Sequence, residues 1–117
     1  MANHVHSQSL RLTDSKEFDR VFQQNKYRVS SPEVLLLALN NNMGVSRLGM
    51  VISKKVTKNA VNRNRIKRCI REAFRRADSV GLDIVVLSRR GINDVPPKML
   101  FHLLKDRFMT LQAESIR

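Results

Sequence analysis

Lysine and arginine are the side chains of this sequence whose number and spacing predict a chemical role. Ten of the 22 basic residues lie in the stretch Lys54–Arg76, which contains a single acid, Glu72. The rest of the chain holds the remaining 12 bases and nine acids and is close to neutral. Positive charge concentrated in this way attracts phosphates, so the sequence predicts a nucleic-acid-binding protein.

The acids, histidines and cysteine form no comparable group. The ten Asp and Glu residues are scattered, so no closely spaced set predicts a two-metal site for phosphodiester cleavage. His4 and His6 have a spacing that suits a metal ion, but no further ligand lies near them. The sequence has no recognisable Ser-His-Asp or Cys-His arrangement and no glycine-rich phosphate loop. We therefore expect no catalytic residue and no metal or cofactor bound by this chain alone.

A helix that starts near Asn59 must position the basic residues. Apolar residues recur at steps of three and four and share one face, namely Ile66, Cys69, Ile70, Ala73, Phe74 and Ala77. The opposite arc holds Asn64, Lys67, Arg68, Arg71 and Arg75, whereas Arg63 projects nearer the apolar edge. We expect the helix to stop near Asp78–Gly81, with Gly81 as its ending signal.

The flanking segments predict the elements that hold this helix. Asp14 and Glu17 form a capping box for a helix over Thr13–Gln24. Its Phe18, Val21 and Phe22 form an apolar stripe, and periodicity alone places both phenylalanines in the core. Strands are expected at Tyr27–Ser31, Val34–Leu39, Arg47–Ser53 and Ile84–Leu87, and a last helix is expected to be capped by Asp94.

This order predicts an α+β protein, a single-domain α-β sandwich over residues 1–117 with one central mixed sheet and helices packed against it. Residues 1–10 are polar and aperiodic, and we expect them to be mobile. The single cysteine gives no internal disulfide, the longest apolar run is too short to span a bilayer, and no secretion signal is recognisable. These features indicate a cytoplasmic protein without a membrane partner. A cationic membrane-surface protein would need an exposed apolar face, which the sheet is expected to cover.

One run of residues resembles a known family. AVNRNRIKRCIREAFR at residues 60–75, preceded by SKK, is similar to the signature of the protein subunit of bacterial ribonuclease P, in which an Arg-Asn-Arg core opens a basic helix. Weaker similarity extends to RL..S.EFDRVF at residues 11–22, RLGMVISKK at 47–55 and DIVVLSRRG at 83–91. The resemblance covers most of the chain in the family's order.

The resemblance implies a fold like the second domain of ribosomal protein S5 (S5 domain 2-like), with an unusual left-handed βαβ crossover. General chain geometry would instead predict a right-handed one. It also implies that the RNA subunit of the complex is the catalyst and holds Mg²⁺. This chain would bind the catalytic RNA and the 5′ leader of precursor tRNA, and would assist endonucleolytic removal of the leader. No obligate protein partner is implied.

The resemblance also assigns residues. Contacts to the catalytic RNA are implied for Lys54, Lys55, Lys58, Arg63, Arg65, Lys67, Arg68, Arg71 and Arg75. Contacts to the leader are implied for Asn64, Phe22 and Phe18, because the first helix forms one wall of a cleft for single-stranded RNA. Leu37 stands where relatives often place a tyrosine, which removes one stacking group. A non-catalytic RNA chaperone or ribosomal protein is the alternative that the charge alone would also fit.

Overall fold

The computed structural model describes residues 11–77 and 81–116. Four strands form one sheet in the order β1-β2-β4-β3, namely β1 (Tyr27–Ser30), β2 (Val34–Asn40), β4 (Leu82–Ser88) and β3 (Arg47–Val51). β1, β2 and β4 pair in antiparallel register, whereas β3 and β4 are parallel. The predicted α+β class with one mixed sheet is therefore confirmed. The histidine pair and the expected mobility of residues 1–10 lie outside the described residues.

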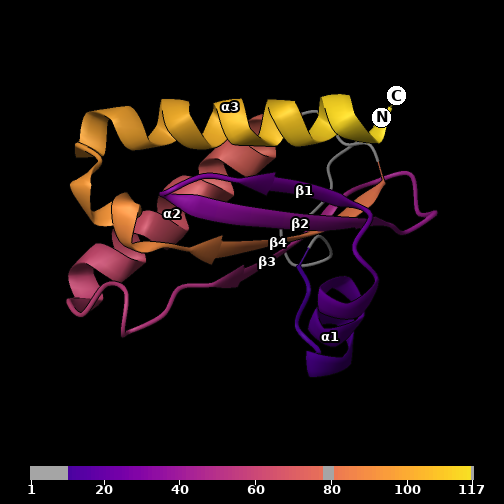
Figure 1. Ribbon diagram of the computed structural model, residues 1–117, viewed down its shortest axis with the longest axis horizontal. Helices are drawn as coiled ribbons and strands as arrows, with labels where there is room; N and C mark the ends of the chain where they lie inside the picture. The colour runs from indigo at the N-terminus through magenta and orange to yellow at the C-terminus, as the bar shows by residue number, and fades with distance from the viewer. Residues whose placement is uncertain (1–10, 78–80, 117) are drawn as a thin grey trace.

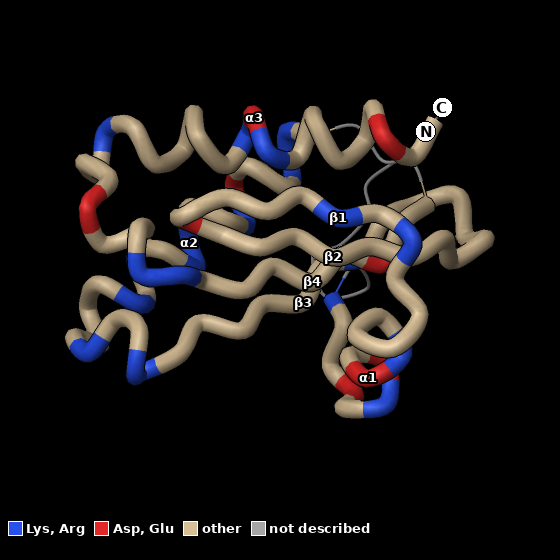
Figure 2. Tube along the Cα trace, viewed as in Figure 1, with Lys and Arg blue, Asp and Glu red and all other residues tan. Residues whose placement is uncertain are grey.

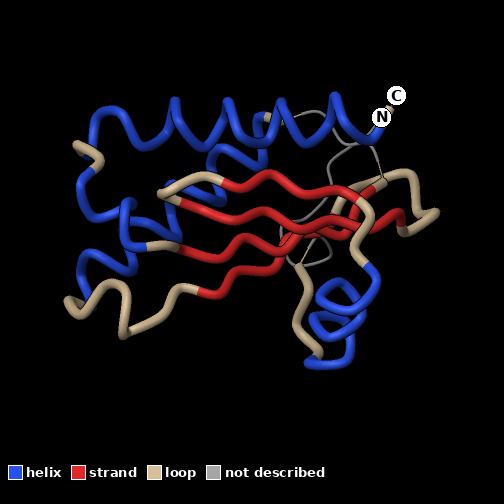
Figure 3. The backbone as a smooth tube through the Cα atoms, viewed as in Figure 1, coloured by secondary structure: helices blue, strands red, loops and turns tan. Residues whose placement is uncertain are grey.

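Two helices cover one face of the sheet, and one covers part of the other (Figure 1). Helices α2 (Ala60–Arg76) and α3 (Pro97–Ser115) enclose the larger core, in which Leu36, Ile70 and Phe108 are fully buried. Helix α1 (Ser15–Gln24) packs on the opposite face through Val21, above Leu37 and Val85. Because α1 is short, it leaves much of this second face open, as Figure 3 shows.

Strands β2 and β4 are apolar along nearly their whole length because both faces are covered. Val34–Leu39 was predicted to be a strand buried on both faces, and the structure extends it by one residue to Asn40. β4 is longer than predicted, since Leu82 and Asp83 pair with Asn40 and Leu39. β3 is shorter and ends at Val51, so Ile52 and Ser53 belong to the loop that leads to α2.

The capping box of α1 is confirmed, and the predicted start of α3 is wrong. The Asp14 side chain accepts from Lys16 N, and the Glu17 side chain accepts from the backbone of Thr13 and Asp14. Asp94 instead belongs to a 3-10 helix, η2 (Arg90–Asp94), and α3 begins at Pro97 with Pro96 as its N-cap. A residue before proline is pushed into extended backbone, so Val95 and Pro96 cannot be helical.

The end of α2 also differs from the prediction. The helix stops at Arg76, and Ala77 is already extended, four residues before Gly81. Gly81 has φ +75°, a conformation that favours glycine, and its carbonyl accepts from Asn41 N at the start of β4. Gly81 therefore shapes the entry to the strand, not the end of the helix.

The β3–α2–β4 unit has the left-handed crossover that the resemblance implies. In Figure 1 both strands run to the left, β4 lies above β3, and α2 lies behind the sheet. Seen from the helix side with the strands pointing up, β4 is therefore to the left of β3. The right-handed preference of βαβ units does not hold here.

Candidate nucleic-acid interface

The positive charge gathers on α2 and on the loop before it. Figure 2 shows lysine and arginine concentrated along the loop after β3 and along α2, at the end of the sheet where β3 and β4 finish. The Asn59 side chain caps α2 by accepting from Val61 N and Asn62 N. Lys54, Lys55, Lys58, Arg65, Arg68 and Arg75 are exposed. Most of the predicted contact residues thus lie together on one end and one edge of the molecule.

Arg63 is held differently from its neighbours. It is partly buried, and its Nη1 donates to the carbonyls of Thr57 at 3.0 Å and Lys58 at 2.7 Å. Thr57 in turn donates to Asn93 of η2, and Asn93 donates to the Val56 carbonyl, both at 2.7 Å. These bonds fix the loop that carries the three lysines, which is a structural task that the sequence did not reveal.

A cleft lies on the side of α2 that faces β3 and α1. It is lined by the side chains of three elements and encloses about 500 Å³. Lys67, Arg71 and Arg75 come from α2, Phe18 from α1, and Gly49 and Met50 from β3. Arg71 Nε is buried and has no hydrogen-bond partner among the described residues. The positive charges of Lys67, Arg71 and Arg75 along the cleft favour an anionic ligand there.

The two phenylalanines of α1 have different surroundings. Phe18 is partly buried and lies over Gly49, where an added Cβ would come within 2.7 Å of its Cζ. Phe22 is 39% exposed and does not line the cleft, so the core position that periodicity predicts is wrong for its ring. Phe22 is therefore free to stack on a ligand, whereas Phe18 packs against β3 and lines the cleft. The exposed Asn64 lies on the crest of α2, between its two sides.

An ion-pair network that the sequence did not predict fixes α1 to the sheet. Arg47 of β3 donates through Nε and Nη2 to both carboxylate oxygens of Asp83 at 2.8 Å, and through Nη1 to Glu17 of α1 at 2.9 Å. Asn41 donates to Asp83 at 2.9 Å. Burial alone would raise the pKa of Asp83, but the hydrogen bonds from Arg47 and Asn41 and the Arg47 charge lower it.

The wall of the cleft thus depends on a buried bidentate pair. Asp83 is 2% exposed, and the hydrogen bonds that Arg47 donates to it raise the pKa of Arg47 further, so both groups are charged in the folded state. Because Glu17 also belongs to the capping box, Arg47 joins the first turn of α1 to β3. The only sequence signal for the network is an arginine and an aspartate on strands that pair.

The described residues contain no group of three His, Cys, Asp or Glu side chains that could hold a metal ion. In the same ranges, no helix is long and apolar enough to cross a bilayer. The surface that the structure does present consists of basic side chains, the exposed ring of Phe22 and the amide of Asn64, which are groups that bind nucleic acid.

Comparison with known proteins gives a consistent result. The family model described as Ribonuclease P matches residues 7–112. The chain is 44% identical over 102 residues to the ribonuclease P protein component of Pseudomonas syringae, an alignment that covers 85% of this chain and 77% of that one. It is 34% identical over 119 residues to the component from a Marinomonas strain, covering 100% and 90%.

Solved structures agree with this. The ribonuclease P protein of Staphylococcus aureus superposes with a TM-score of 0.75 at 27% identity, covering 91% of this chain and 94% of that one. The protein from Thermotoga maritima gives a TM-score of 0.65 at 33% identity, covering 82% and 96%.

Proposed function

We propose which surfaces of this chain, which belongs to the bacterial ribonuclease P protein family, bind the RNA subunit and which bind precursor tRNA. The family forms the protein component of a ribonucleoprotein endonuclease that processes precursor tRNA, with catalysis by the RNA subunit. The cationic loop and the exposed crest of α2 contact phosphates of the RNA subunit, and the cleft beside α1 receives the 5′ leader. Mg²⁺ enters through the RNA subunit, and the complex works in the cytoplasm.

The observation that carries this proposal is the division of the cationic residues between two sides of α2. Lys67 and Arg71 line the cleft with Phe18, whereas Arg65 and Arg68 lie outside it. A cleft lined by cationic side chains and aromatic rings suits a single strand, whose phosphates and bases are both accessible. An exposed cationic crest suits the backbone of a structured RNA.

This division refines the residue assignments. Lys54, Lys55, Lys58, Arg65 and Arg68 contact the RNA subunit, and Arg63 supports their loop while leaving its other guanidinium nitrogens for phosphate. Lys67, Arg71 and Asn64 contact leader phosphates, Phe22 stacks on a leader base, and Phe18 shapes the cleft. Arg75 is exposed and lines the far end of the cleft, within reach of either RNA. Leu37 is buried under α1, so it offers no stacking surface.

A binding titration over a range of salt concentrations tests the proposal. If about six phosphates of the RNA subunit are neutralised, the slope of log K against log salt should be roughly −4 to −5. The protein without the RNA subunit should not cleave precursor tRNA in a single-turnover assay. A slope near zero, or cleavage at the mature 5′ end without the RNA subunit, would contradict the proposal.

A further inference from the structure

A second hollow lies on the other side of α2, between this helix and α3. It encloses about 360 Å³ and is lined by Arg65, Arg68, Cys69 and Glu72 of α2 and by Phe101 of α3. None of these residues lines the cleft beside α1. We refer to this hollow as the α2–α3 groove.

The Phe101 ring is held in place by its neighbours. It is partly buried against the main core, and the guanidinium of Arg76 lies over the ring at 5.8 Å from its centroid. The His102 ring meets it edge-on, with centroids 5.6 Å apart and an interplanar angle of 73°. Arg76 is itself fixed by Glu72, which accepts from its Nε at 2.9 Å. An aromatic ring that is already ordered loses little entropy when it stacks on a ligand.

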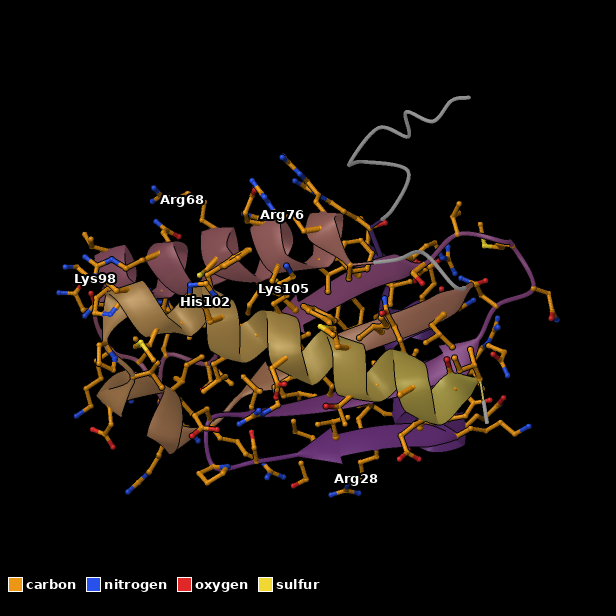
Figure 4. All side chains as sticks on the ribbon, turned by 90° about the horizontal axis from the view of Figure 1, so that it is seen from above. Arg28, Arg68, Arg76, Lys98, His102 and Lys105 are labelled. Carbon is orange, nitrogen blue, oxygen red and sulfur yellow. The ribbon has the colours of Figure 1, made fainter. Side chains whose placement is uncertain are left out.

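Basic side chains lie on both helices near the groove. Figure 4 shows Arg68 and Arg76 on α2, Lys98 at the start of α3, and Lys105, with His102, on the edge of α3 that faces α2. Glu72 is the one acid that lines the groove, and it is occupied by Arg75 at 3.3 Å and Arg76 at 2.9 Å. An apolar floor with a fixed aromatic ring inside a cationic rim is the arrangement that receives a base between its phosphates.

We propose that the α2–α3 groove binds one unpaired nucleobase of the RNA subunit, stacked on Phe101, with the flanking phosphates on Arg68, Lys98 and Lys105. This inference rests on the proposed function and adds a base contact to a surface otherwise assigned to phosphates.

A pair of substitutions isolates the stacking contact. Phe101→Leu keeps an apolar side chain of similar size and removes the ring, whereas Phe101→Tyr keeps the ring. With the full-length RNA subunit, Phe101→Leu should weaken binding by about 5- to 150-fold and Phe101→Tyr by less than about threefold. The salt slope should stay the same for both, because no phosphate contact is lost. Equal affinity of the Leu variant and the unchanged protein, at equal thermal stability, would overturn the proposal.

Cys69 provides an independent readout that needs no change at Phe101. It is the single cysteine of the chain and lines the groove, so its alkylation rate reports access to it. The RNA subunit should slow alkylation by about tenfold or more. The control is Thr110→Cys combined with Cys69→Ala. Thr110 follows Arg107 by three residues on α3, and Arg107 reaches Glu33 on the other side of that helix. The RNA subunit should change the alkylation rate of this control variant by less than about twofold.

A photocrosslinker attached to Cys69 then identifies the partner. In the complete complex with precursor tRNA, it should react with the RNA subunit. Reaction with the leader, or an unprotected Cys69 in the complex, would refute the groove assignment. The proposed function can be judged separately from the charge variant Arg65→Glu/Arg68→Glu. If that variant loses RNA binding while Phe101→Leu does not, the proposed function is supported and the base-binding role of the α2–α3 groove is refuted. If neither variant loses RNA binding, both proposals are refuted.

Discussion

The two sides of α2 carry similar charge but differ in how the fold holds it. On the side facing α1, Arg71 has a buried Nε with no hydrogen-bond partner among residues 11–77 and 81–116, and nearby Lys67 and Phe18 complete a cleft. On the side facing α3, Glu72 holds Arg75 and Arg76, and Arg76 lies over Phe101. One helix can therefore present an unsatisfied, enclosed cationic surface to a single strand and an exposed, pre-ordered one to a structured RNA.

The cleft side depends on a remote anchor that the α3 side does not need. Arg47 joins Asp83 of the sheet to Glu17 of α1, so the position of Phe18 over Gly49 follows from a buried ion pair. The α3 side is instead supported by the large core between α2, α3 and the sheet. We expect the cleft to be the more easily damaged of the two.

Asp83→Asn should give the largest effect. It leaves Arg47 partly buried with one carboxylate partner fewer, and breaking a buried pair costs about 3–5 kcal/mol of unfolding free energy. Chemical denaturation measures this loss. Glu72→Gln is the control, because that carboxylate pairs with its arginines at the surface and its loss should change stability far less. Equal losses in the two variants would show that the Asp83 pair does not anchor α1.

The same pair predicts a pH dependence. The pKa of Asp83 is lowered in the folded state, so its contribution to stability is present above about pH 4 and is lost as the pH falls through the lowered pKa. Denaturation of the unchanged protein between pH 6 and pH 3 should therefore show a decline that Asp83→Asn reduces. An equally steep decline in the variant would mean that other carboxylates cause it.

Gly49→Ala should have a smaller, local effect. Its Cβ would lie 2.7 Å from Phe18 Cζ, so the ring and α1 must move, at a cost of about 1–3 kcal/mol in stability. Preference for precursor over mature tRNA should fall, while binding to the RNA subunit should stay near normal. Gly44→Ala is not a suitable control, because Gly44 has φ +77° and an alanine there would be strained. A loss of RNA-subunit binding in Gly49→Ala would break the distinction between the two sides.

Phe22→Ala should change binding more than stability. Its ring is 39% exposed, so the loss of stability should be about 1–2 kcal/mol, below the roughly 3–5 kcal/mol of a core phenylalanine. If the ring stacks on a leader base, precursor preference should fall by roughly 1–3 kcal/mol. The comparison of thermal melts with leader-dependent binding decides this. A clear loss of stability without a loss of precursor preference would show that Phe22 acts as a packing residue and not in leader binding.

Sequence patterns predicted the elements better than the contacts between them. The helix over residues 60–76, the Asp14 capping box and the doubly buried β2 follow from local periodicity and side-chain chemistry, and the structure has all three. The Arg47–Asp83 pair could not be predicted in this way, because its members are 36 residues apart and meet only through the parallel register of β3 and β4.

The candidate site shows the same division. The cationic residues were visible as a run of charge, but their separation onto two sides of α2 required knowing where α1 and α3 lie. The space left by the missing side chain of Gly49 is filled by the Phe18 ring, which only the position of α1 reveals. Phe101 lies beside the apolar stripe of α3 and gave no signal of its own, since only its contact with Arg76 reveals it. The crossover's left hand came from the family resemblance, because general chain geometry predicts the opposite.

Two single charge reversals, each measured in two assays, test the central claim that the sides of α2 serve different RNAs. Arg68→Glu should weaken binding to the RNA subunit on the order of tenfold or more, with precursor preference unchanged once the complex is saturated with protein. Arg71→Glu should reduce precursor preference and affect RNA-subunit binding far less, with a thermal melt to confirm the fold. The account predicts this crossed pattern. If both variants lose RNA-subunit binding equally and neither changes precursor preference, the two sides are one surface and the account is contradicted.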